Sequence, residues 1–127
     1  MTLNCAFGRT LAIAIGFLPL LGFAGEQENS GCRKDSRVVA ACFTVHGRLS
    51  NWNGNPTERI WIVGTKRMLG LREGTSLPRV LEDKLGSFDV EVYGDFEFCP
   101  FTAEKSGVMQ VGCIAGVSNY QIKKRDH

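Results

Sequence analysis

Apolar and polar side chains alternate along two long segments of the chain, residues 39–50 and 88–98. Period-two alternation is typical of a β-strand that buries one face and exposes the other. Burying one Phe side chain contributes about 1.5 to 3 kcal/mol, so the Phe-rich face of the second segment is expected to lie in the core. That face comprises Phe88, Val90, Val92, Gly94, Phe96 and Phe98, and the opposite face comprises Asp89, Glu91, Tyr93, Asp95 and Glu97.

Three further segments complete the expected set of strands. Residues 59–68 begin with a continuous apolar run, which is typical of a central strand buried on both faces. Residues 120–123 are expected to add a short final strand. Residues 109–117 are the third of these segments and are expected to bury one face made of Met109, Val111, Cys113, Ala115 and Val117.

Turns are expected at residues 51–56 and 70–74, where Gly, Asn or Pro interrupts the pattern.

One short helix is expected over residues 77–85. Leu77, Leu81 and Leu85 recur at helical spacing, Pro78 suits a first helical turn, and Gly86 suits the exit. A helix of this length is not stable alone and must pack on the sheet. Together the elements predict a mainly β fold, a small antiparallel β-sandwich or a partly open barrel with one short helix.

The first 24 residues have the pattern of a secretory signal peptide. Arg9 supplies a positive charge, residues 11–21 are apolar, and Gly22-Phe23-Ala24 forms a small-residue exit. The apolar run is shorter than the roughly 20 residues that span a membrane, although an uncleaved anchor helix is the alternative. We therefore expect a secreted or periplasmic protein. Its expected divisions are a signal peptide at 1–24, a polar flexible leader at 25–37, a single β-rich domain at 38–122 and a basic tail at 123–127.

The charge of the chain is nearly balanced. Its 127 residues include 15 Lys and Arg against 13 Asp and Glu, and removal of residues 1–24 takes away one basic residue and no acidic one. Partners such as nucleic acid select for clustered excess positive charge, so no nucleic-acid partner is expected. No membrane span is expected after signal removal. The one basic run, Lys123-Lys124-Arg125, is interpreted as a solvated, frayed tail.

Four cysteines remain after signal removal, and an exported domain of about 100 residues is a natural candidate for two disulfides. Four cysteines allow three pairings. If residues 105–107 form a hairpin loop, Cys99 faces Cys113, which predicts that these two are bonded. Cys32 would then pair with Cys42. The cysteines lack the closely spaced pairs of a zinc site, so neither a metal nor a cofactor is expected.

The segment Val45-His46-Gly47-Arg48-Leu49, followed by Gly54, Pro56, Ile60 and Ile62, resembles the opening hairpin of carboxypeptidase-regulatory-like and transthyretin-like β-sandwich domains. The resemblance covers about residues 45–62. The chain departs from that pattern after Gly64, where a Thr-Asp and Gly-aromatic continuation is missing, and at the helix-like segment 77–85. The resemblance implies a non-catalytic accessory or recognition module.

Candidate catalytic groups are few. His46 shares a polar strand face with Thr44 and Arg48, and a solvated histidine is the simplest interpretation. The carboxylates of Asp89, Glu91, Asp95 and Glu97 are expected to form a solvated face, paired across strands with Arg48 or Lys66. The alternative is a small exported hydrolase that uses these carboxylates with His46.

The preferred hypothesis is a secreted or periplasmic binding or structural module without catalytic activity. Exposed aromatic side chains can stack on sugars or anchor a partner, and Trp52 and Tyr93 are expected to reach the surface. Trp61 is flanked by Ile60 and Ile62, which favours a place in the core over the surface. The ligand is expected to be a protein or a carbohydrate. The candidate binding residues are Trp52, Arg59, Trp61, Lys66 and Arg67.

Overall fold

The computed structural model describes residues 27–28, 30–86 and 88–126 of the chain, so the predicted signal peptide at 1–24 lies outside the described residues. The fold is mainly β, as predicted, with two short helices. The strands are β1 (Gln27–Glu28), β2 (Phe43–Asn51), β3 (Glu58–Ile62), β4 (Met68–Leu71), β5 (Val90–Pro100) and β6 (Gln110–Lys124), and the helices are α1 (Ser30–Arg33) and α2 (Arg79–Lys84).

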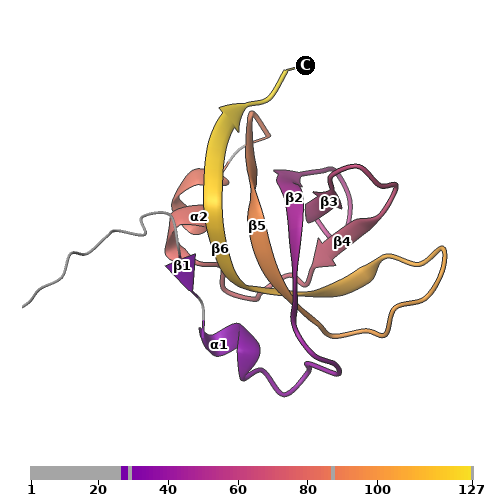
Figure 1. Ribbon diagram of the computed structural model, residues 1–127. Coiled ribbons are helices and arrows are strands. Elements are labelled where there is room, and N and C mark those ends of the chain that lie inside the picture. Colours follow the sequence, from indigo (N-terminus) through magenta and orange to yellow (C-terminus); the bar gives the residue numbers. More distant parts are fainter. Residues whose placement is uncertain (1–26, 29, 87, 127) are drawn as a thin grey trace, which may run out of the picture.

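Strands β2 to β6 form a closed ring. Antiparallel pairs join β2 to β3, β3 to β4, β2 to β5 and β5 to β6, and a parallel pair joins β4 to β6. Figure 1 shows β6 as a long curved strand (yellow) beside β5, and its other edge pairs with β4 and then with the short β1. This strand order, with α2 between β4 and β5, is the topology of the OB-fold barrel.

The core lies inside the ring and is closed by α2. The alternation in β5 behaves as predicted, because Val92, Phe96 and Phe98 are fully buried. The predicted helix is confirmed over a shorter span; it buries Leu81, and Leu85, the residue that caps its C-terminus, is buried in the same cluster. Phe88, expected in this face, precedes β5 and is 47% exposed. The other buried members are Leu49, Ile60, Leu69, Leu71, Ile114 and Val117.

The prediction of one central strand over residues 59–68 is wrong, because a tight turn divides that segment into β3 and β4. Gly64 adopts a φ of 85°, a left-handed conformation that glycine accepts without strain. The Thr65 hydroxyl donates to the Ile62 carbonyl at 2.8 Å, and the Arg67 amide donates back to that hydroxyl at 2.9 Å. The predicted turn at 70–74 consequently begins later, because β4 runs to Leu71.

The alternation predicted for residues 109–117 is also wrong. Ile114 and Val117 belong to the core inside the ring, whereas Cys113 and Ala115 belong to a second buried cluster. The pairing of β5 with β6 shifts register between Glu97 and Phe98, where β6 carries one extra residue. A bulge of this kind reverses which side chains face inward, so a single period cannot describe the whole strand.

The predicted disulfide pairing is corrected by the structure. Cys99 does lie opposite Cys113, but the bonds join Cys32 to Cys113 and Cys42 to Cys99. The reason is that β5 has two neighbours. The register of Phe43 opposite Phe98 brings the preceding residue, Cys42, to Cys99 from the β2 side, with 4.2 Å between their Cα atoms. Cys113 is then bonded to Cys32 in α1, over the second cluster.

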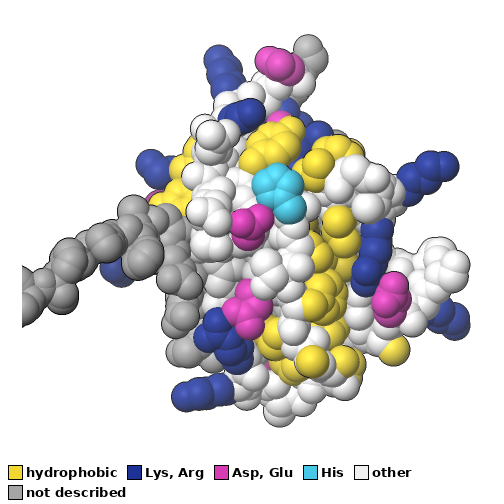
Figure 2. All heavy atoms as spheres, viewed as in Figure 1, with side chains coloured by type: hydrophobic (Ala, Val, Ile, Leu, Met, Phe, Trp, Pro, Cys, Tyr) yellow, Lys and Arg dark blue, Asp and Glu magenta, His cyan; other side chains and the backbone are white. Residues whose placement is uncertain are grey.

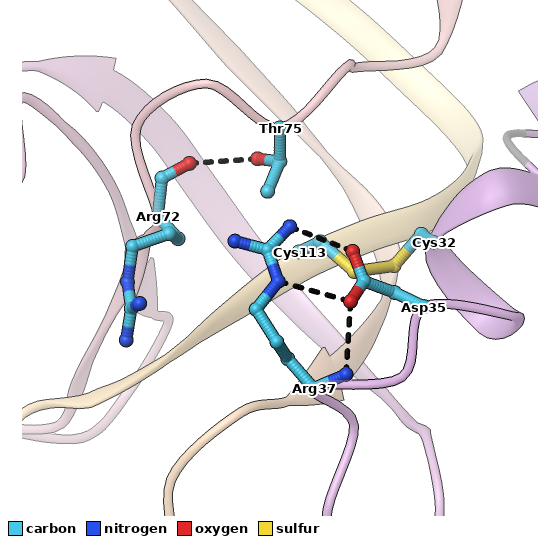
Figure 3. A network of polar contacts seen from close by, with 6 residues as sticks. All are labelled: Cys32, Asp35, Arg37, Arg72, Thr75 and Cys113. Atoms are coloured by element: carbon cyan, nitrogen blue, oxygen red, sulfur yellow. Dashed lines mark hydrogen bonds and ion pairs between the residues drawn. A yellow bond between two sulfur atoms is a disulfide. The ribbon is translucent and has the colours of Figure 1, made fainter.

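The segment predicted as a polar leader is held over this second cluster. Figure 3 shows the Arg37 guanidinium facing the Asp35 carboxylate beside the Cys32–Cys113 disulfide, with nitrogen to oxygen distances of 2.7 and 2.9 Å. Arg37 also stacks on the Phe101 ring, 4.6 Å from its centroid. The disulfide fastens the segment to β6, and the stacking of Arg37 fastens it to Phe101, the residue that follows β5.

The predicted basic tail begins later than expected, because β6 continues to Lys124 and Arg125 is anchored. The Arg125 amide donates to the Asp89 carbonyl at 2.7 Å, and its guanidinium donates to the Asn51 carbonyl at 2.8 Å. The interpretation of this run as a frayed tail is therefore wrong for residues 123–125. Of the helices in the described part of the chain, neither is long and apolar enough to cross a membrane.

Candidate binding face

One row of side chains crosses the outer surface of three neighbouring strands. Trp61 in β3 lies opposite Arg48 in β2, and Arg48 lies opposite Tyr93 in β5. They point outward because their neighbours Leu49, Ile60 and Val92 point into the core. The Arg48 guanidinium lies 4.8 Å from the centroid of the Trp61 ring, within range of a cation–π interaction.

A carboxylate links this row to a second arginine. Glu91 Oε2 lies 3.5 Å from Arg48 Nε and also 3.5 Å from Arg125 Nε. The predicted pairing of this acidic strand face with Arg48 is therefore confirmed at Glu91. The Lys123 ammonium lies 4.9 Å from the centroid of the Tyr93 ring. Cations and aromatic rings thus alternate across β3, β2, β5 and β6.

Trp52 lies beside this row, in the loop between β2 and β3. Its ring has two cationic neighbours, with Arg59 at 5.7 Å and Arg125 at 5.1 Å from the centroid. Arg59 is itself fixed by donating to the Pro56 carbonyl at 2.8 Å, and the loop is closed by a bond from the Trp52 amide to the Thr57 carbonyl at 2.7 Å. We call the combined surface the aromatic face; it comprises Arg48, Trp52, Arg59, Trp61, Tyr93, Lys123 and Arg125.

A hollow of about 500 Å³ opens at one end of the aromatic face. It is bounded by the end of β6 and the outer faces of β2 and β5. Its lining is mostly polar and carries more positive than negative charge. The lining residues are Arg48, Glu91, Tyr93, Lys123, Lys124, Arg125 and Asp126.

The other two predicted binding residues lie in a separate cleft. Lys66 and Arg67 line a cleft of about 780 Å³ between the β3–β4 turn and the loop that joins β5 to β6. Arg67 is engaged by the protein itself, because it donates to Gln110, lies 3.5 Å from Glu104 and stacks 5.7 Å from the Phe43 ring. The sequence-predicted set is therefore divided, with Trp52, Arg59 and Trp61 on the aromatic face.

The carboxylates of the alternative hydrolase are occupied by structural contacts. Arg33 donates to both oxygens of Glu97, and this pairing lowers the pKa of the Glu97 carboxyl. Hydrogen bonds from Asn119 and then His46 lower the pKa of Asp95. A general acid requires a raised pKa near the working pH. The contacts therefore suit Asp95 and Glu97 to a structural role and not to proton donation.

His46 is paired with Asp95 on the outer surface. The His46 Nδ1 atom lies 2.9 Å from Asp95 Oδ1, and Asn119 donates to the other Asp95 oxygen at 3.0 Å. Figure 2 shows this histidine (cyan) beside a carboxylate (magenta), with an apolar band (yellow) next to them and basic side chains (dark blue) mainly around the rim. Within the described part of the chain, the His46 ring forms no hydrogen bond with a hydroxyl or thiol that could act as a nucleophile.

A third, smaller hollow of about 260 Å³ lies beside the Cys32–Cys113 disulfide. Asp35 and Arg37 line it and bond to each other, which lowers the pKa of the Asp35 carboxyl to about 2. Thr75 on its other side donates to the Arg72 carbonyl at 2.7 Å, as Figure 3 shows. Asp35 thus bonds to Arg37, and Thr75 to the Arg72 carbonyl, which points to a structural role for these groups.

Comparisons with protein-family models, with curated proteins and with solved structures find no match. The resemblance to carboxypeptidase-regulatory-like domains accordingly stays a prediction.

Sequence reasoning missed part of this face. The sequence pattern places Arg48 and Tyr93 at outward strand positions but does not predict them as binding residues, because their adjacency depends on the pairing of β2 with β5. For Lys123 and Arg125 the sequence pattern favours a frayed tail. Gln121 and Lys123 are two residues apart, so in a strand they share one face. This spacing indicates an outward position for Lys123 only once β6 is known to continue to Lys124.

Proposed function

We propose that the protein is a non-catalytic module that acts outside the cytoplasm and binds carbohydrate through the aromatic face. The observation that carries the proposal is the row Trp61, Arg48 and Tyr93 on three adjacent strands. Aromatic rings offer flat apolar surfaces to the C–H groups of a sugar, while arginine N–H groups are suited to its oxygens.

The location of the face in the fold supports the same conclusion. In OB-type barrels, oligosaccharides or oligonucleotides bind to the surface of the second and third strands, with the loops between the first and second and between the fourth and fifth strands. The equivalent parts here are β3, β4, the loop with Trp52 and the loop of residues 101–109, so Trp52 and Trp61 lie in that region and the rest of the aromatic face extends from it over β2, β5 and β6. This support is an analogy between folds, because one fold serves many functions.

Two properties favour carbohydrate over nucleic acid. The net formal charge of the chain is only +2, whereas binding to a nucleic-acid backbone relies on neutralising many phosphates. The two disulfides are consistent with a non-cytoplasmic protein, because such bonds persist in oxidising compartments.

The test is a glycan array probed with the full chain, purified under oxidising conditions. We expect binding to a subset of glycans, and we expect Trp61→Ala and Trp52→Ala each to reduce it at least tenfold. Val108→Ala is the control, because Val108 is 58% exposed and lines the separate cleft with Lys66. Absence of binding to every glycan, or loss on Val108→Ala but not on Trp61→Ala, would contradict the proposal.

A further inference from the structure

The hollow at the end of the aromatic face carries uncompensated positive charge. Four of its lining residues are Lys or Arg and two are carboxylates. Glu91 is already shared by Arg48 and Arg125, each 3.5 Å away. Within the described residues, neither Lys123 nor Lys124 forms an ion pair with a carboxylate, so their charges remain available to a ligand.

Arg48 is positioned in advance to bind an anion. Its side chain is only 25% exposed, and stacking on Trp61 fixes the plane of its guanidinium. Its Nε is buried without a hydrogen-bond partner, and in the described part of the chain no acceptor bonds to its terminal nitrogens. The buried Nε faces Glu91, so the terminal N–H groups are the ones suited to the paired oxygens of a carboxylate or sulfate.

Lys123, in β6, lines the same hollow as Arg48. Its ammonium is held over the Tyr93 ring at 4.9 Å, and Tyr93 is the residue opposite Arg48. The hollow therefore presents a planar cation from β2 and a point cation from β6, and the strand that carries Tyr93 lies between these two strands. A sugar ring seated at Tyr93 would bring an acidic substituent between the two cations.

We propose that this hollow binds the acidic group of a negatively charged oligosaccharide, with Arg48 and Lys123 as its principal contacts. The inference rests on the proposed carbohydrate-binding function and names its ligand class. Carboxylate and sulfate groups share the required chemistry, so the two are compared directly in the experiment. A nucleic acid is the competing anion, and a single-stranded oligonucleotide serves as its probe.

The experiment measures binding of the full chain to four probes: polygalacturonate, dextran sulfate, neutral dextran and a single-stranded oligothymidylate. We expect binding to at least one acidic polysaccharide, no binding to neutral dextran, and weakening as NaCl rises because salt screens exposed charges. Arg48→Gln and Lys123→Gln should each lower the affinity about tenfold, as expected for the loss of a charge-assisted hydrogen bond.

Lys105→Gln is the matched control, because Lys105 is an exposed lysine in the separate cleft, and it should leave the affinity unchanged. Lys123 is exposed, so Lys123→Gln keeps the inference testable even if Arg48→Gln unfolds the protein. Thermal melting of each variant identifies such unfolding.

The outcomes separate the two proposals. Binding to neutral glycans that depends on Trp61 but not on Arg48 or Lys123 would overturn this inference and leave the proposed function intact. Binding to oligothymidylate as tight as to the acidic polysaccharides would overturn it in favour of a nucleic-acid ligand. Absence of binding to all glycans, on the array and here, would overturn both.

Discussion

Cys99 lies directly opposite Cys113 in the β5–β6 pair, yet each is bonded to a cysteine from another part of the chain. Two disulfides therefore lie side by side on the same hairpin, within the second buried cluster. They connect it to β2 through Cys42 and to α1 through Cys32. A disulfide between Cys99 and Cys113 would have joined the two strands of the hairpin to each other. The observed disulfides instead join segments that are distant in sequence.

This pairing can be tested by peptide mapping without reduction. Trypsin cleavage after Arg33, Arg48 and Lys105 separates all four cysteines. We expect one linked pair containing Cys32 with Cys113 and another containing Cys42 with Cys99. Replacing both cysteines of either bond by Ser should cost about 2 to 5 kcal/mol of unfolding free energy. A linked peptide joining Cys99 to Cys113 would contradict the structure.

Gly47 is required by the close approach of β2 to β3. A Cβ atom added there would lie 2.4 Å from Cγ2 of Ile60 and 3.0 Å from the Trp61 carbonyl oxygen. Gly47→Ala should therefore destabilise the protein by about 1 to 3 kcal/mol in urea unfolding, the usual effect of overpacking. Gly86→Ala is the control, because no atom lies within 4 Å of its added Cβ. Equal stability of the two variants would show that β3 can move away.

Stability should fall in acid below pH 4. Ion pairing with Arg37 lowers the pKa of Asp35 from 3.8 to about 2, and contacts with Asn119 and Arg33 lower those of Asp95 and Glu97. A lowered folded-state pKa means that the unfolded chain binds the proton more tightly. These groups therefore stabilise the fold above about pH 4, and for Asp35 this contribution is lost as the pH falls from 3.8 toward 2.

The measurement is the midpoint of thermal unfolding as a function of pH for wild type and Asp35→Asn. The variant should be less stable at pH 7, and the difference should shrink as the pH approaches 2. A difference that stays constant across this range would assign the effect to packing and not to the charge of Asp35.

Glu58 should show the opposite pH dependence. Burial raises the pKa of its carboxyl, and the nearby Glu73 and Glu82 raise it further. Because the raised pKa disfavours the charged form in the folded state, Glu58→Gln should raise the melting temperature at pH 7. The gain should disappear as the pH falls and the wild-type carboxyl becomes neutral. Glu104→Gln, which removes an exposed carboxylate 3.5 Å from Arg67, should give no gain.

The order of apolar and polar residues predicted those elements in which a single spacing of apolar residues holds from the first residue to the last. The alternation in β5 identified Phe96 and Phe98 as core residues, and the glycine in the following loop predicted the register that sets Cys99 opposite Cys113. Helical spacing predicted α2 through Leu81. In each case the signal lies within about ten consecutive residues.

The features that were missed depend on contacts between distant segments. The bulge in β6 moves Ala115 out of the core face, and no local residue signals it. The disulfides follow from the pairing of β2 with β5, and the place of Arg48 between Trp61 and Tyr93 follows from the same pairing. The aromatic face could be predicted only in part, because a row across three strands exists only once their order is known.

Closure of the barrel depends on β6, which contacts β4 along one edge and β5 along the other. A chain that emerges from the ribosome with its N-terminus first lacks both contacts until residues 110–124 are made. Until then β4 and β5 each retain an unpaired edge and the shared interior is open to water. Closure of the barrel is thus the last step of assembly, and it waits for a strand that lies near the C-terminal end of the described residues.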